Sequence, residues 1–167
     1  VLDGTAAWRI NNSATGAHIS RAHQTITVPT TILHPQLSFY WSAVLQSAGH
    51  GPADQPYADV LIQDVTDPNN VTVVYFKHIA AQDPTYPGWQ INGSWGAIPW
   101  QKVSLPNLTA LKGHKLKITV TAADCTQGGH GGYVYLDNIA CNLFHPMPFR
   151  TPGAVMSLRS TLTLLLA

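Results

Sequence analysis

Short segments in which apolar and polar residues alternate recur along this chain, and they constrain its fold more than any other feature. Alternation of this kind, enriched in β-branched and aromatic residues, is typical of strands that bury one face. Clusters of Gly, Pro, Asn and Asp separate the segments and favour turns. The segments cover residues 5–10, 22–28, 36–46, 57–66, 71–80, 98–105, 114–123 and 132–143.

The composition agrees with an all-β chain. All eight acidic residues are Asp and none is Glu, while there are 13 Gly and 12 Pro, so strong helix formers are scarce. Eight short strands in one chain of 167 residues predict a two-sheet antiparallel jelly-roll β-sandwich of about eight strands. We expect this module to occupy residues 1–144.

The pattern changes after the last predicted strand. Residues 145–167 contain several prolines and then an apolar run that carries Arg159. This run is shorter than the ~20 apolar residues that span a bilayer, so we expect no complete membrane span in it. We predict a C-terminal tail outside the core, and both a truncated anchor or sorting segment and a frayed terminus stay open.

The net charge limits the classes of partner expected for this chain, and the cysteine content bears on its cellular compartment. The formal charge is +1 and no long basic run exists, so nucleic acid is not an expected partner. Cys125 and Cys141 lie 16 residues apart, which predicts one disulfide, with two buried free thiols as the alternative. The predicted disulfide favours a secreted or cell-surface protein.

The connections between strands differ in length, and strand parity groups them. In an antiparallel sandwich alternate connections share one end, which here brings together the longer set. These connections are residues 11–21, 47–56, 81–97 and 124–131. The 81–97 connection is long and aromatic, and such loops are commonly functional.

This connection supplies the predicted ligand-binding residues. Flat aromatic rings pack against pyranose C–H faces, and polar side chains beside them hydrogen-bond hydroxyl groups. The alternative is that Trp89 and Trp95 fold back as the loop's own small core. The predicted ligand-binding residues are Tyr86, Trp89, Trp95, Asp83 and Asn92, joined by His50 and His130 from the same end. The tryptophans within strand patterns, Trp8, Trp41 and Trp100, are predicted to be core residues.

Histidines and a cysteine gather at the same predicted end, as in transition-metal sites. The chain has no C-x-x-C or H-x-x-x-H pair, and Cys125 is expected to be oxidised, so the spacing argues against zinc. The glycines of 128–132 instead predict close backbone approach in a tight turn, with His130 bonded to a neighbour such as Asp124.

The opposite end offers a candidate structural calcium site. By strand parity Asp137 of the last strand lies near the N-terminal segment and its Asp3. Carboxylates close to chain carbonyls are the oxygen ligands that Ca²⁺ accepts. The alternative is a surface Asp137 that caps a strand end.

Enzyme signatures are weak. Residues 92–96 lack the first glycine of a nucleophile elbow. A glycosidase pair would have to come from Asp54, Asp83 and Asp124, because the chain has no Glu. We therefore predict a protein that is not an enzyme.

One stretch carries a family resemblance. Residues 124–137, DCTQGGHGGYVYLD, resemble a DC..GGH.GY.Y.D block of β-sandwich modules in bacterial secreted and cell-surface proteins, both adhesin-like and gliding-associated. Residues 100–105 and 108–113 resemble the matching W..V.L.L....G run, and residues 7–12 resemble the opening strand. Together they cover most of the predicted module.

The resemblance implies a jelly-roll or galactose-binding-like module similar to carbohydrate-binding domains. It implies a structural calcium near Asp137, and it allows sugar to bind on a concave sheet face, where Tyr40, Tyr75 or Tyr133 would matter most. We expect a non-catalytic, carbohydrate-binding or adhesive module whose partner is a glycan or another cell-surface component. The alternative is a purely structural or protein-docking spacer domain.

Overall fold

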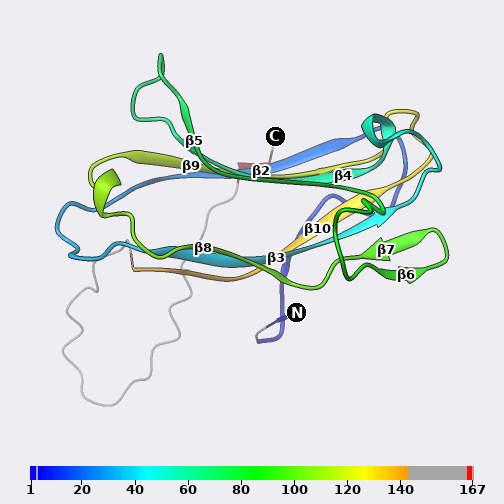
Figure 1. Ribbon diagram of the computed structural model, residues 1–167, viewed down its shortest axis with the longest axis horizontal. Helices are drawn as coiled ribbons and strands as arrows, with labels where there is room; N and C mark the ends of the chain where they lie inside the picture. Colours follow the sequence, from blue (N-terminus) through cyan, green and yellow to red (C-terminus); the bar gives the residue numbers. More distant parts are fainter. Residues whose placement is uncertain (3, 143–164, 167) are drawn as a thin grey trace.

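The computed structural model describes residues 1–2, 4–142 and 165–166, which form two antiparallel sheets packed as two layers (Figure 1). Two short 3-10 turns, η1 (Pro52–Asp54) and η2 (Thr109–Leu111), lie in connections. The strands are β1 (Trp8–Ile10), β2 (Ile19–Thr27), β3 (Leu37–Gln46), β4 (Tyr57–Asp64), β5 (Thr72–Ala80), β6 (Gln90–Asn92), β7 (Trp95–Ala97), β8 (Gln101–Leu105), β9 (Lys115–Ala123), β10 (Gly132–Cys141) and β11 (Leu165–Leu166).

The strand order is that of a jelly roll. Sheet A runs β1-β10-β3-β7-β6, with β8 also paired to β3, and sheet B runs β11-β2-β9-β4-β5. Leaving aside the short β6, β7 and β11, the eight remaining strands can be numbered in chain order. Sheet A then holds the first, eighth, third and sixth, and sheet B holds the second, seventh, fourth and fifth. This alternation between layers confirms the predicted jelly-roll β-sandwich.

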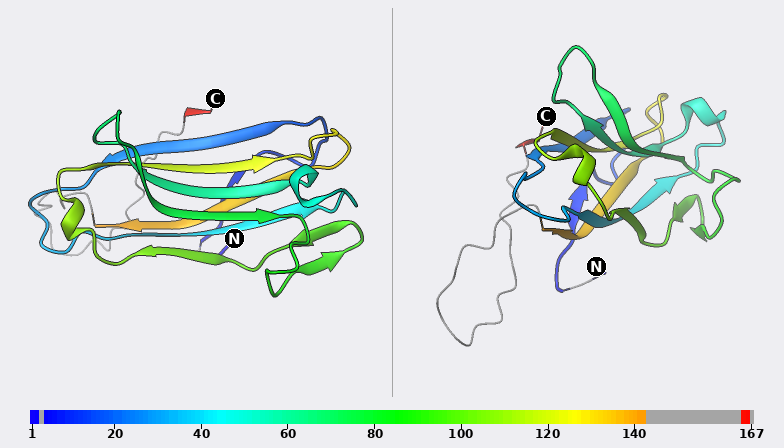
Figure 2. Two further views of the ribbon diagram at one scale, coloured as in Figure 1. Left: turned by 45° about the horizontal axis from the view of Figure 1, so that its top comes forward. Right: turned by 60° about the vertical axis from the view of Figure 1, so that its left-hand side comes forward.

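The core lies between the two sheets and follows from the alternation. In β3 the side chains of Phe39 and Trp41 point inward and are almost fully buried, and in β4 those of Val60 and Ile62 are fully buried. Burial of one such side chain contributes roughly 1.5–3 kcal/mol. The shared core joins the two layers, which Figure 2 shows from two further directions.

The predicted strands agree with the observed ones to within a few residues, except in one connection. Residues 81–97, predicted as a loop, contain the hairpin of β6 and β7, which extends sheet A beyond β3. In the predicted C-terminal tail, Leu165 pairs with His23 of β2 and Leu166 pairs with Ala22. The rest of that tail, residues 145–164 and 167, lies outside the described residues. Within the described part of the chain, no helix has the length and apolarity to cross a membrane.

The predicted gathering of long connections is confirmed. The Asn11 side chain donates to Asp124 across 3.0 Å, and the Thr126 hydroxyl donates to Asp54 across 2.7 Å. The backbone of Ser47 donates to that of Ser94 across 2.6 Å. We call the side of the sandwich that holds the β1–β2, β3–β4, β5–β8 and β9–β10 connections the loop end (Figure 1, right).

The predicted disulfide is wrong. Cys125 is a free, fully buried thiol at the loop end, whereas Cys141 is the last residue of β10. A strand of 10 residues is roughly 30 Å long, while bridged cysteines have Cα atoms less than about 7 Å apart. The 15 intervening residues, 126–140, therefore form a turn followed by an extended strand, which carries Cys141 away from Cys125.

Candidate functional site

A row of aromatic side chains covers part of the outer, solvent-facing side of sheet A. It originates in β10, where Val134 and Leu136 are buried and the alternate residues Tyr133 and Tyr135 face outward and are half-buried. The two tyrosine rings meet edge to face with centroids 5.6 Å apart. The strand pleat therefore places both rings on the surface.

Two tryptophans extend this row at either side. Trp95 of β7 lies with its ring centroid 5.8 Å from that of Tyr133, and Trp100, which precedes β8, lies 6.5 Å from Tyr135. We call these four side chains, Trp95, Tyr133, Tyr135 and Trp100, the aromatic strip. Each is half-buried, so each ring is in part accessible to solvent.

Cationic side chains flank the strip. The Arg9 guanidinium lies 4.1 Å from the centre of the Tyr133 ring, and the Lys102 ammonium lies 5.8 Å from that of Tyr40. Burial raises the pKa of the Tyr133 hydroxyl and Tyr135 adds to the rise, while Arg9 opposes it. Tyr133 therefore stays protonated at neutral pH and can donate a hydrogen bond beside a stacked ring.

The two tryptophans predicted to act together in the 81–97 connection lie in different environments. The Trp89 indole N–H donates to the backbone oxygen of Asp83 across 3.1 Å, and its ring packs against the core and meets Tyr86 edge to face. A Cβ placed on Gly96 would lie 3.0 Å from that ring, so glycine makes room for it. Trp89 anchors the connection, as the alternative interpretation expected, whereas Trp95 joins the aromatic strip.

The polar residues of the same connection also differ in their surroundings. The Asp83 carboxylate accepts hydrogen bonds from the Thr85 backbone at 2.8 Å and from the Thr85 hydroxyl at 2.6 Å, and these bonds lower its pKa. Asp83 thus caps a turn. Asn92 is exposed at the tip of the β6–β7 hairpin, beside Gly93, whose φ of 61° suits a two-residue hairpin turn.

Only one of the three predicted core tryptophans is a core residue. Trp41 is 1% exposed, as predicted, whereas Trp8 is 40% exposed and Trp100 belongs to the aromatic strip. Trp8 begins β1, the edge strand of sheet A, so it has a neighbouring strand on one side only. Trp100 lies one residue before β8, on the outward side of its pleat.

The glycine-rich turn behaves as predicted in its backbone and differently in its side chains. A Cβ on Gly131 would lie 2.9 Å from the Ala14 oxygen, which confirms the close approach of two backbones. His130 contacts the Cys125 sulfur at 3.6 Å, rather than Asp124 as predicted. The buried Asp124 carboxylate instead accepts from the Asn11 amide, the His18 backbone and the Gly132 backbone.

His50 joins this turn from the β3–β4 connection. Its ring meets that of His130 edge to face with centroids 5.5 Å apart. The ligand atoms of His50, Cys125 and His130 all lie within 4.8 Å of one another. The structure therefore brings together two of the predicted ligand-binding residues, at a place distinct from the aromatic strip.

The other predicted site lies at the far end of β10. One Asp137 oxygen accepts the Leu2 backbone N–H at 2.6 Å and the other accepts that of Asn138 at 2.7 Å. The N-terminal segment is therefore beside Asp137, as strand parity predicted. Asp3 lies outside the described residues, and the calcium site stays a prediction.

Each of the three carboxylates considered for catalysis accepts hydrogen bonds from neighbouring residues of the chain. Asp54 accepts from the Thr126 hydroxyl, Asp83 from Thr85, and Asp124 from three donors of neighbouring segments. Their oxygens stabilise the loop end, which accounts for these residues without a catalytic role.

Neither family models nor curated proteins match this sequence. Among solved structures, the carbohydrate-binding module TmCBM61, in complex with β-1,4-galactotriose, is similar over 86% of this chain and 74% of its own, at 12% identity and a TM-score of 0.48. Empty particles of cowpea mosaic virus give 8% identity and a TM-score of 0.34, covering 89% and 97% of the two chains. Values this low say nothing about what this chain binds.

Sequence reasoning did not select Tyr135, Trp100 or Arg9 for the site. The spacing of Tyr133 and Tyr135 by two residues, between the apolar Val134 and Leu136, was the available signal, because it places both rings on one face. The position of Trp95 beside them depends on the pairing of β7 with β3, which alternation alone does not reveal.

Proposed function

We propose that this chain is a non-catalytic module that binds glycans through the aromatic strip on the outer face of sheet A. The observation that carries the proposal is the continuous contact of Trp95, Tyr133, Tyr135 and Trp100 on a solvent-facing surface. Four neighbouring rings on the outside of a sheet do not serve the core, and their partly exposed faces match the C–H faces of successive pyranose units.

Polar groups beside the rings supply hydrogen bonds to sugar hydroxyls. Arg9 lies over Tyr133, and Gln46, which pairs with Trp95 across the sheet, donates from its amide to the Ser94 hydroxyl at 3.2 Å. Aromatic area with a few oriented polar groups is the usual composition of a small-ligand site. The proposed ligand is therefore an oligosaccharide lying along the strip.

The setting we propose is a secreted or cell-surface, adhesive protein of bacterial type, in which the module is one part of a longer chain. The support for this setting is the resemblance of residues 124–137 to surface-protein modules. Calcium near Asp137 belongs to the same proposal, because the Asp137 carboxylate already ties the N-terminal segment to β10.

The test is a glycan-array screen of the 167-residue chain with and without calcium, followed by titration of any glycan that binds. Trp95→Ala and Trp100→Ala are each expected to weaken binding by roughly tenfold or more, about 1.4 kcal/mol. Phe76→Ala is the matched control, because Phe76 is an aromatic residue of sheet B that is 55% exposed.

Circular dichroism and thermal unfolding of each variant establish that the fold is intact. Binding lost in the strip variants and kept in Phe76→Ala supports the proposal. Absence of binding to any glycan, or equal binding by all variants, would overturn it in favour of the structural or protein-docking alternative.

A further inference from the structure

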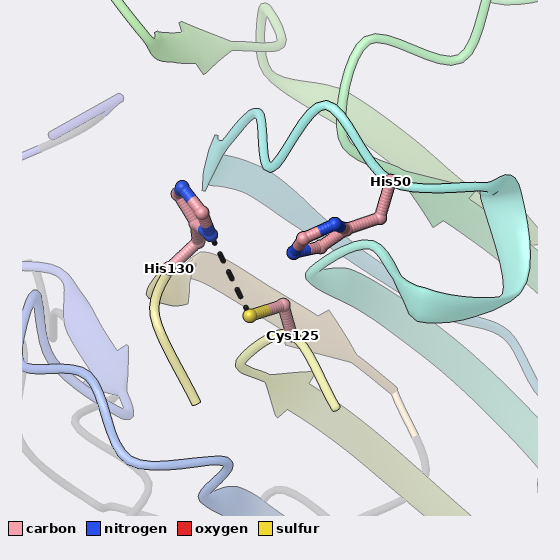
Figure 3. A group of neighbouring side chains, drawn as sticks. All are labelled: His50, Cys125 and His130. Carbon is pink, nitrogen blue, oxygen red and sulfur yellow. Dashed lines mark hydrogen bonds between the residues drawn. The ribbon is translucent and has the colours of Figure 1, made fainter. Parts of the chain in front are cut away.

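Two histidines and a cysteine from distant parts of the chain converge at the loop end (Figure 3). His50 comes from the β3–β4 connection, and Cys125 and His130 come from the β9–β10 connection. Figure 3 shows the two rings and the thiol turned toward one another. The Cys125 sulfur lies 3.6 Å from His130 Nδ1, and every pair of ligand atoms in the trio is within 4.8 Å.

The β9–β10 connection holds two of these residues in a fixed relation. The Cys125 backbone N–H donates to the His130 oxygen at 2.9 Å, and the Gly128 N–H donates to the Cys125 oxygen at 3.0 Å. The Gly129 N–H points at the Cys125 sulfur, 3.3 Å away. These hydrogen bonds fix the Cys125 sulfur beside the His130 ring.

The connection that carries His50 is also pinned to the sandwich. The buried Gln55 side chain donates to the His50 backbone oxygen at 3.1 Å and accepts the Ala48 N–H at 2.8 Å. Gln55 therefore fixes the backbone at His50, and the His50 ring meets the His130 ring edge to face.

The donor set and its dimensions fit a zinc ion. Zinc binds imidazole nitrogen at about 2.0–2.1 Å and thiolate sulfur at about 2.3 Å, so neighbouring ligand atoms of a tetrahedral site lie about 3.5 Å apart. The Cys125–His130 separation of 3.6 Å already has this value. A small rotation of the His50 side chain would bring its ring nitrogen to the third coordination position, because its ligand atom already lies within 4.8 Å of the other two.

The neighbouring carboxylates already accept hydrogen bonds from the chain, so the fourth coordination position of the metal is left to solvent. Asp124 accepts from three donors of the chain, and Asp54 accepts from the Thr126 hydroxyl. His50 and His130 are both half-buried, so an ion can reach the trio from the surface. Three protein ligands and one exchangeable position is the arrangement of open zinc sites.

We propose that His50, Cys125 and His130 bind one Zn²⁺ ion at the loop end. Binding replaces the thiol proton of Cys125 with the metal, and the proton passes to the buffer. One of the two grounds on which the sequence argued against zinc, oxidation of Cys125, does not hold, because the structure has this residue as a free thiol. The other ground, the spacing, applies to ligands carried on one segment, whereas these three come from two connections. The site is separate from the aromatic strip and goes beyond glycan binding.

The test uses the full 167-residue chain, stripped with a chelator and titrated with Zn²⁺ against a chromophoric zinc chelator. We expect one ion per chain, and with Co²⁺ as the spectroscopic substitute a thiolate-to-metal charge-transfer band. His50→Ala and His130→Ala are each expected to weaken binding by at least about tenfold, the loss that even an outer-shell partner brings. His34→Ala is the matched control, because His34 is exposed in the β2–β3 connection, at the opposite end.

A second readout tests the role of Cys125 without substituting this fully buried residue. Bound Zn²⁺ is expected to slow alkylation of Cys125, read by peptide mapping, while alkylation of Cys141 is unchanged. Absence of stoichiometric binding, a cobalt spectrum without the thiolate band, or equal affinity of His50→Ala and wild type would each overturn the proposal. Glycan binding is tested with variants of the aromatic strip, and zinc binding is tested with variants of His50 and His130. Failure of one proposal can therefore be recognised independently of the other.

Discussion

At the scale of single residues, Asp64 shows how one carboxylate can tie two strands and a turn together. It ends β4, is nearly buried, and accepts from the Thr66 backbone at 3.0 Å and the Thr66 hydroxyl at 2.5 Å. Its second oxygen pairs with His114 Nδ1, just before β9, at 2.5 Å. The Thr66 hydroxyl, followed by His114, lowers the pKa of Asp64 from 3.8 to about 2.

This shift makes stability depend on acid pH in a defined direction. The pKa of Asp64 is lower in the folded chain than in the unfolded one, so its contribution is present above about pH 4 and is lost as the pH falls toward 2. Asp64→Asn is expected to cost on the order of 1–2 kcal/mol at pH 7, and this difference from wild type should shrink between pH 4 and 2. Urea unfolding at several pH values measures it, with the exposed Asp67→Asn as control. A difference that stays constant down to pH 2 would contradict the assignment.

At the scale of elements, the β9–β10 connection is packed backbone to backbone against the β1–β2 connection. Gly131 and Gly132 leave no space for a side chain, since an added Cβ would lie 2.9 Å from the Ala14 oxygen and 2.8 Å from the Ala123 oxygen. Cys125 and His130 of the proposed zinc site, and Tyr133 of the aromatic strip, lie close to this contact in the chain. The glycines are therefore required by packing rather than by turn flexibility.

A pair of glycine substitutions tests that packing. Gly131→Ala is expected to destabilise the fold by about 1–3 kcal/mol, because the clash is with backbone and cannot be relieved by a side-chain rotation. Gly129→Ala, two residues away in the same turn, meets open space and should leave the unfolding midpoint nearly unchanged. Chemical denaturation of both variants gives the comparison, and equal midpoints would show that the backbones separate easily.

The elements also show what the sequence could predict. Alternation located all eight strands of the jelly roll, because each strand of a two-layer sandwich buries one face and exposes the other. It missed the β6–β7 hairpin, whose residues Gln90, Ile91 and Asn92 are all exposed, so no burial pattern marks the strand. The Gly93-Ser94 pair, which forms the two-residue turn, was the signal that could have located the hairpin.

At the scale of the whole molecule, both proposed sites are products of topology. The aromatic strip combines side chains of β7, of β10 and of the residue before β8. The proposed zinc site combines His50 with Cys125 and His130. Strand parity predicted which connections share an end, so it placed His50 near His130. Spacing motifs could not identify the proposed metal ligands, because such motifs describe ligands carried on one local segment. The side-by-side position of Trp95 and Tyr133 needed the sheet order itself.

The antiparallel pairing of β1 with β10 also decides how the sandwich responds to mechanical tension. β1 begins, and β10 ends, at the side opposite the loop end, where Leu2 is bonded to Asp137. A force applied through residues 2 and 142 therefore acts parallel to the hydrogen bonds between β1 and β10. In this unzipping geometry the bonds break one after another. Single-molecule pulling is expected to give a low unfolding force in this geometry. Moving the second handle to residue 126 would load the same bonds in shear and raise the force, and equal forces would refute this account.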